Sequence, residues 1–173
     1  NIITDLSPLA RLKNLEWLYL QKNNITDISP LADLVNLEVL ILDNFPLDHQ
    51  VQNLISDITP LTELVNLDVL NLGDNNITDL SPLARLTNLT DLYLQENNIT
   101  NISLLPGLTN LIRLDLNANN ITDFSPLAEL TNLMGLYLRE NSISDLSPLS
   151  GLTNLIELDL RANNISESSN AML

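Results

Sequence analysis

Cysteine is absent from the 173 residues, which excludes disulfides, thiol catalysis and thiolate metal sites. The chain also has only one histidine and four scattered glycines. We find no nucleophile beside a base, no cluster of metal ligands and no phosphate-binding loop. We therefore predict that the protein is not an enzyme and needs no cofactor and no metal.

Basic residues are scarce, since 7 lysines and arginines face 22 aspartates and glutamates for a net charge of −15. A nucleic acid backbone requires a basic surface, so we predict no nucleic acid partner. The same acidity disfavours anionic membranes. It either keeps an extended molecule soluble, which we favour, or matches a basic partner.

Long hydrophobic runs are also missing. No stretch approaches the roughly 20 apolar residues of a spanning helix, so we predict no membrane insertion. Aromatic residues make up only 3% of the chain, although 45% of it is hydrophobic. The core must therefore be built from leucine and isoleucine.

What the chain does contain is a repeat of 22 residues, exemplified by residues 67–88. A partial repeat occupies residues 1–14, and the spacing is broken once, by an eight-residue insertion placed at 45–52. The full units begin at Leu15, Leu37, Leu67, Leu89, Leu111, Leu133 and Leu155. We predict a single repeat domain over residues 1–173.

Each unit opens with alternating leucines, as in residues 89–94, and this period of two predicts a short strand with one buried face. A turn with a fixed asparagine follows, such as Asn75, whose amide can satisfy buried backbone groups. The sequence predicts an α/β solenoid. Its parallel sheet lines a concave face, and short 3₁₀ or α turns line the convex face.

A Ser-Pro or Thr-Pro pair then predicts an N-cap and the first residue of a short helical turn. The unit at Ser103 lacks this proline, so we expect a less regular turn there. Aspartate recurs just before the pair, as at Asp79. Stacked aspartates can collect calcium, but we favour hydrogen bonds to the local turn.

The pattern LxxLxLxxNxI resembles the leucine-rich repeat. With Ile-Thr-Asp-Ile-Ser-Pro-Leu and Leu-Thr-Asn-Leu, the 22-residue unit is similar to the repeats of bacterial internalins, surface proteins that bind other proteins. The resemblance implies a protein partner, contacts on the concave face and a secreted or cell-surface location. The alternative is an intracellular scaffold, similar to the leucine-rich subunits that hold a phosphatase.

The outward positions of the first three strands form an apolar patch, and tryptophan and tyrosine are enriched at binding hot spots. Its members are Trp17, Tyr19, Val39, Ile41 and Val69. The patch either anchors a partner or packs against the insertion or an N-terminal cap.

The outward positions of the later strands are polar. We predict that five of them orient a partner: Tyr93, Arg113, Tyr137, Arg139 and Arg161. The alternative, which we favour for Arg139 and Arg161, is cross-strand pairing with Asp115 and Asp159. Nothing in the sequence indicates a carboxylate of raised pKa that would turn these acidic residues into a hydrolase site.

The insertion is a second candidate binding element, because insertions in a repeat array map to loops. It holds the only histidine, His49, near Asp43 and Asp48, but one imidazole is a weak sign of a metal site. We further expect end-to-end self-association, since terminal units leave leucine faces uncovered.

Overall fold

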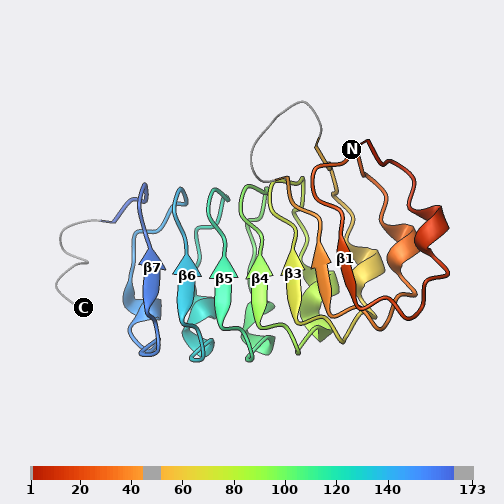
Figure 1. Cartoon of the computed structure of the whole chain (residues 1–173). Helices are drawn as coiled ribbons and strands as arrows, with labels where there is room; N and C mark the ends of the chain where they lie inside the picture. The colour runs from red at the N-terminus through yellow and green to blue at the C-terminus, as the bar shows by residue number, and fades with distance from the viewer. Residues whose placement is uncertain (1, 45–51, 166–173) are drawn as a thin grey trace.

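The computed structural model describes residues 2–44 and 52–165. Over these residues one parallel sheet of seven short strands runs in chain order, and 3₁₀ segments lie behind it (Figure 1). The strands are β1 (Trp17–Tyr19), β2 (Val39–Ile41), β3 (Val69–Asn71), β4 (Asp91–Tyr93), β5 (Arg113–Asp115), β6 (Gly135–Tyr137) and β7 (Glu157–Asp159). The predicted solenoid is confirmed, with its sheet on the concave face.

The convex side carries one 3₁₀ segment per unit, because about seven residues leave no room for a longer helix. The segments are η1 (Ser7–Leu9), η2 (Ser29–Leu31), η3 (Thr59–Leu61), η4 (Ser81–Arg85), η5 (Leu105–Gly107), η6 (Ser125–Glu129) and η7 (Ser147–Leu149). The irregularity expected at Ser103 is confirmed, since η5 begins two residues later than its counterparts.

The core lies between the sheet and the 3₁₀ segments. The middle residue of every strand is a leucine that points inward; Leu40, Leu70 and Leu92 are fully buried. Because the strands pair in register, each leucine packs against its equivalent in the next unit. The same register aligns the outward residues into columns, for example Trp17 with Val39.

Asparagine forms a ladder inside the turn after each strand. The Nδ2 of Asn75 donates to the carbonyls of Leu42, Leu72 and Gly73, and its Oδ1 accepts the amide of Ile55. Asn53 takes this place after the insertion and accepts the amide of Ile25. Of the predicted insertion at 45–52, residues 45–51 lie outside the described residues.

The prediction that serine or threonine caps the convex turn is wrong. Ser81 is the first residue of η4, and its amide donates to Oδ1 of Asp79 at 2.8 Å. The hydrogen bonds to Ser81 hold the pKa of Asp79 below its usual value. The aspartate is favoured because its side chain reaches an amide two residues on. The recurring aspartates are therefore turn residues, as expected.

Candidate functional site

The concave face of β1 to β3 carries the predicted apolar patch. The side chains of Trp17 and Tyr19 are exposed, with 58% and 61% of their surface accessible. Val39, Ile41 and Val69 are half-buried beside them. The strand register brings all five residues together, on a surface that other described residues leave uncovered.

The concave face of β4 to β7 holds a cluster centred on Arg113. Its guanidinium lies 3.0 Å from Oδ1 of Asp91, which also accepts the hydroxyl of Tyr93 at 3.2 Å. Hydrogen bonds to the Tyr93 and Tyr137 side chains raise the pKa of Arg113. Tyr137 in turn donates to Glu157. Tyr93, Arg113 and Tyr137 are thus held together as one polar surface.

Gly135 makes room for this cluster. A Cβ at Gly135 would lie 3.4 Å from Cε2 of Tyr137 and 3.5 Å from Cγ and Nε of Arg113. These are ordinary van der Waals distances, so the Arg113 and Tyr137 side chains lie directly over Gly135. The sequence contained this signal as a glycine in an outward strand position, but periodicity alone did not show what it accommodates.

Arg139 and Arg161 stand apart from the cluster. The expected partner Asp159 is confirmed for Arg161, but neither arginine forms an ion pair across strands, so the cross-strand geometry is wrong. Arg139 pairs with the adjacent Glu140, and Arg161 pairs with Asp159 two residues earlier, with Nη2 2.6 Å from Oδ2. Both partners lie within the same unit as the arginine. Among the described residues Asp115 forms no ion pair.

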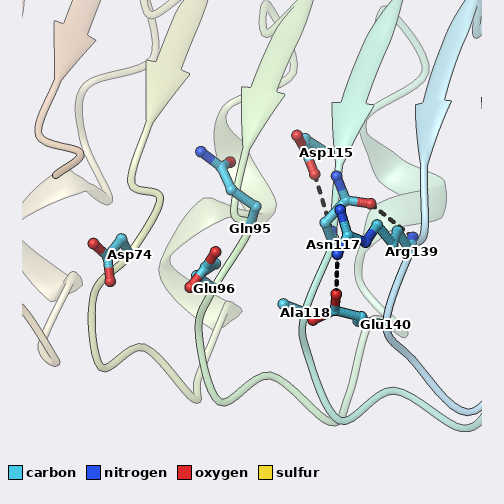
Figure 2. Close-up of a pocket in the computed structure, with 8 residues that line it drawn as sticks. All are labelled: Asp74, Gln95, Glu96, Asp115, Asn117, Ala118, Arg139 and Glu140. Atoms are coloured by element: carbon cyan, nitrogen blue, oxygen red, sulfur yellow. Dashed lines mark hydrogen bonds and ion pairs between the residues drawn. The ribbon is translucent and has the colours of Figure 1, made fainter. Parts of the chain in front are cut away.

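A pocket of about 380 Å³ opens at the carboxyl ends of the strands. Figure 2 shows its lining, which comes from the ends of β3 to β6 and the turns that follow: Asp74, Gln95, Glu96, Asp115, Asn117, Ala118, Arg139 and Glu140. Four carboxylates face one guanidinium here, and that guanidinium is already bonded to Glu140. The pocket suits a donor-rich or cationic group.

Burial raises the pKa of Asp115 to about 6, although its Oδ1 accepts the amide of Asn117 at 2.9 Å. Hydrogen bonds from Arg161 hold the pKa of Asp159 at about 2. The sequence had indicated no carboxylate of raised pKa, and in this respect the interpretation is wrong. Asp115 occupies an outward position of its strand, so the sequence predicted an exposed side chain. In the structure the neighbouring strands partly bury this carboxylate.

Gln95 is a further residue that sequence reasoning missed. Its side-chain amide folds over Gly73, where an added Cβ would lie 2.2 Å from Nε2. Within the described part of the chain, its buried Oε1 has no hydrogen-bond partner. A glycine one strand away from a long side chain in the same column was the signal.

A metal site finds no support in the described ranges 2–44 and 52–165, which hold no group of three or more potential ligands. Asp48 and His49 lie outside these ranges. No helix in the same ranges has the length and apolar character needed to cross a membrane.

Comparisons with known proteins define the class. The family profile described as "Leucine Rich repeats (2 copies)" matches residues 13–63, 87–129 and 131–171. The chain therefore belongs to the leucine-rich repeat family. A sequence comparison with curated proteins gives no match.

Solved structures refine this class to the bacterial internalin type. Internalin inlF of Listeria monocytogenes is 35% identical, with a TM-score of 0.82 over 96% of this chain and 53% of its own. Internalin inlC2 of the same organism is 38% identical, with a TM-score of 0.74 over 91% of this chain and 76% of its own. The chain thus spans only about half of the inlF structure.

A plant relative extends the likeness to receptors. The peptide hormone receptor RGFR1, solved in complex with RGF2, is 26% identical, with a TM-score of 0.76 over 94% of this chain and 27% of its own. Structures of this fold thus include a peptide hormone receptor as well as internalins.

Proposed function

We propose that the protein is a recognition module that binds a partner protein through its concave face, in internalin-like adhesion or surface recognition. It acts by binding and not by catalysis. The observation that carries the proposal is the exposed aromatic pair Trp17 and Tyr19, presented beside half-buried aliphatic residues. Large aromatic side chains on a rigid surface lose little entropy when a partner covers them.

The cluster around Arg113 supplies orientation. Its guanidinium is fixed by Asp91 and the two tyrosines, so a partner meets polar groups in one geometry. Charged groups of this kind contribute more to specificity and association rate than to affinity. Arg139 and Arg161 form the outer rim of the same surface, where exposed ion pairs are weak and can exchange partners.

We further propose a secreted or bacterial cell-surface location. The identity of 35% to inlF and 38% to inlC2 favours surface recognition over the intracellular scaffold. The partner remains defined by its chemistry, as a protein with an apolar anchor site for Trp17 and Tyr19 and polar groups opposite Arg113.

The test is affinity capture from a cell-surface extract with the purified chain and with Trp17→Ala plus Tyr19→Ala. Removing both rings is expected to weaken capture by at least about tenfold, because the loss of even one hot-spot side chain costs about 2 kcal/mol or more. The melting temperature should barely move, because both side chains are largely exposed.

A matched control removes two exposed apolar side chains elsewhere. Leu12 and Val35 are 47% and 44% exposed and lie outside the sheet columns, so Leu12→Ala plus Val35→Ala should leave capture unchanged. Equal loss of capture in both double variants would contradict the proposal. A large drop in the melting temperature of the Trp17→Ala, Tyr19→Ala variant would show that the patch is structural.

We also propose end-to-end self-association through β7, the last strand within the described residues. Leu158 has 43% of its surface accessible, whereas its equivalent Leu136 in β6 is fully buried. Sedimentation of the chain at rising concentration should show a growing dimer fraction, and Leu158→Lys should abolish it. A strict monomer at high concentration would rule the association out.

A further inference from the structure

A second surface lies outside the concave columns, along the edge where the strands begin. It is formed by the residue that follows the first leucine of each unit, from Glu16 in the first full unit to Ile156 in the last. Two hollows of about 840 and 750 Å³ follow this edge. Both are lined by Asn88, so they adjoin there and together extend along the starts of all seven strands; we call the two hollows together the edge groove.

One wall of the groove is a row of asparagines, one per unit. Each donates its Nδ2 to a backbone carbonyl of the preceding unit at 2.7 to 2.9 Å. The row comprises Asn36, Asn66, Asn88, Asn110, Asn132 and Asn154. These bonds fix each side chain, and within the described residues its Oδ1 accepts no hydrogen bond. The wall therefore offers a line of oriented acceptors.

The half of the groove beside β1 to β3 is acidic. Glu16, Glu38 and Asp68 stand in consecutive units, and all three are exposed. Within the described part of the chain, Glu16 and Glu38 form no ion pair, and Asp68 accepts the hydroxyl of Thr90 at 2.5 Å. The three carboxylates make this half negatively charged, so it favours a ligand that brings donors and positive charge.

Beside β5 to β7 the row that holds carboxylates in the first units holds aliphatic residues instead. Ile112, Met134 and Ile156 occupy the same row and are 40%, 43% and 72% exposed. Their backbones are bonded in sequence, with Met134 N donating to Ile112 O and Ile156 N to Met134 O, both at 2.8 Å. Three exposed aliphatic side chains held in line favour a complementary apolar ligand.

We propose that this edge groove binds an extended peptide segment of a partner, with lysine or arginine at one end and aliphatic side chains at the other. Seven units at about 4.8 Å per step give a groove about 29 Å long, which matches roughly nine extended residues at about 3.3 Å each. Peptide amides and basic side chains satisfy the asparagine and carboxylate acceptors, and aliphatic side chains cover Ile112, Met134 and Ile156.

The acidity of the groove decides between occupants. Phosphate-rich ligands are repelled by Glu16, Glu38 and Asp68. A second copy of this chain, with a net charge of −15, is repelled by the same three carboxylates and is a poor ligand for this groove, whereas the association proposed at β7 uses the apolar Leu158. A peptide with a basic end is attracted, so charge complementarity selects it. The groove does not use Trp17, Tyr19 or Arg113, and its occupancy is independent of the concave face.

The test uses fluorescein-labelled nine-residue peptides and fluorescence anisotropy with the intact chain at low salt. One probe carries three lysines, three serines and three leucines in that order, and a second carries the reverse order. Binding is expected for at least one of them, about tenfold tighter than for versions with glutamate in place of lysine or serine in place of leucine.

Variants then place the peptide in the groove. Glu16→Gln plus Glu38→Gln should weaken binding about threefold to tenfold, and Met134→Gln plus Ile156→Thr about tenfold. The matched control, Glu63→Gln plus Glu129→Gln, changes the net charge equally on the convex side and should leave binding unchanged. Trp17→Ala plus Tyr19→Ala should also leave it unchanged.

Two results would overturn the groove. The first is equal weakening by the groove pair and the convex pair of glutamate variants, which would mean that only net charge matters. The second is a peptide affinity that falls in the Trp17→Ala, Tyr19→Ala variant but stays the same in the Met134→Gln, Ile156→Thr variant. That result would place the peptide on the concave face. Retained melting temperatures show that each variant is folded.

Discussion

The two halves of the solenoid share one interior and carry opposite surfaces. On the concave face, the half containing β1 to β3 is apolar, around Trp17 and Tyr19, and the half containing β4 to β7 is polar, around Arg113. Along the edge groove the order is reversed, with carboxylates beside β1 to β3 and aliphatic residues beside β5 to β7.

This reversal shows that the backbone does not determine the surface chemistry. Strands β2 and β6 pair with their neighbours in the same register and bury the same central leucine. What differs is the outward residue in each column, so one scaffold can present distinct surfaces on its concave face and on its edge.

The largest expected effect tests whether the interiors of the two halves are equivalent. Asn75 and Asn119 each make four hydrogen bonds to buried backbone groups, at 2.9 to 3.3 Å. Changing Asn75 or Asn119 to alanine leaves the buried amide of Ile55 or Ile99 without its acceptor and removes three further hydrogen bonds, so it should lower the free energy of unfolding by about 3 kcal/mol. Urea denaturation followed by circular dichroism measures the loss.

The control for the ladder is the exposed asparagine row. Asn66→Ala removes one bond, from Nδ2 to Val35 O at 2.8 Å, and should cost about 1 kcal/mol or less. A loss in Asn75→Ala that differs from that in Asn119→Ala by more than about 1 kcal/mol would contradict the equivalence of the two interiors.

The interior was predictable from the sequence, because constant spacing alone determines which leucines and asparagines stack. The asparagine ladder and the strand register both followed from the 22-residue period. The second asparagine row, which includes Asn66, was overlooked although it recurs at the same spacing. An exposed asparagine that follows a valine or a threonine is an ordinary turn residue by sequence alone, so its hydrogen bond to the preceding unit was not predicted.

The surface was less predictable, because its contacts depend on side-chain reach. The outward strand positions predicted that Tyr93, Arg113 and Tyr137 share one face. They did not predict that the side chains of Arg113 and Tyr137 contact each other over Gly135. Arg139 and Arg161 form ion pairs with carboxylates in their own units and not with those on neighbouring strands. The burial of Asp115 arises from surrounding strands, which a single column does not describe.

The next largest effect concerns a charge that is buried in only one of the two halves and that affects stability at neutral pH. Asp115 is a largely buried carboxylate, and the β3 residue in its column is the uncharged Asn71. Asp115→Asn keeps an acceptor for the Asn117 amide and removes the charge. We expect the free energy of unfolding at pH 7 to rise by about 1–3 kcal/mol.

The pH dependence follows from the sign of the shift. Burial raises the pKa of Asp115 from 3.8 to about 6, so the folded protein binds more protons than the unfolded chain between these values. Stability from the neutral carboxyl is complete below pH 3.8 and is lost as the pH rises through 6. The difference between Asp115→Asn and the parent should grow over this interval, and a constant difference would disprove the assignment.

The smallest expected effect concerns the left-handed residue in the turn after each strand, and it should be the same in both halves. Lys22 and Ala118 have φ of 54° and 50°, a left-handed conformation that costs a non-glycine residue about 1–2 kcal/mol. Lys22→Gly and Ala118→Gly remove this cost but add backbone entropy to the unfolded chain, so each should stabilise by about 0.5 kcal/mol. Ala128→Gly, within η6, should destabilise because no strain is relieved there. Thermal unfolding of the three variants measures the differences. A gain at Lys22 with a loss at Ala118 would show that the turns of the two halves are not equivalent.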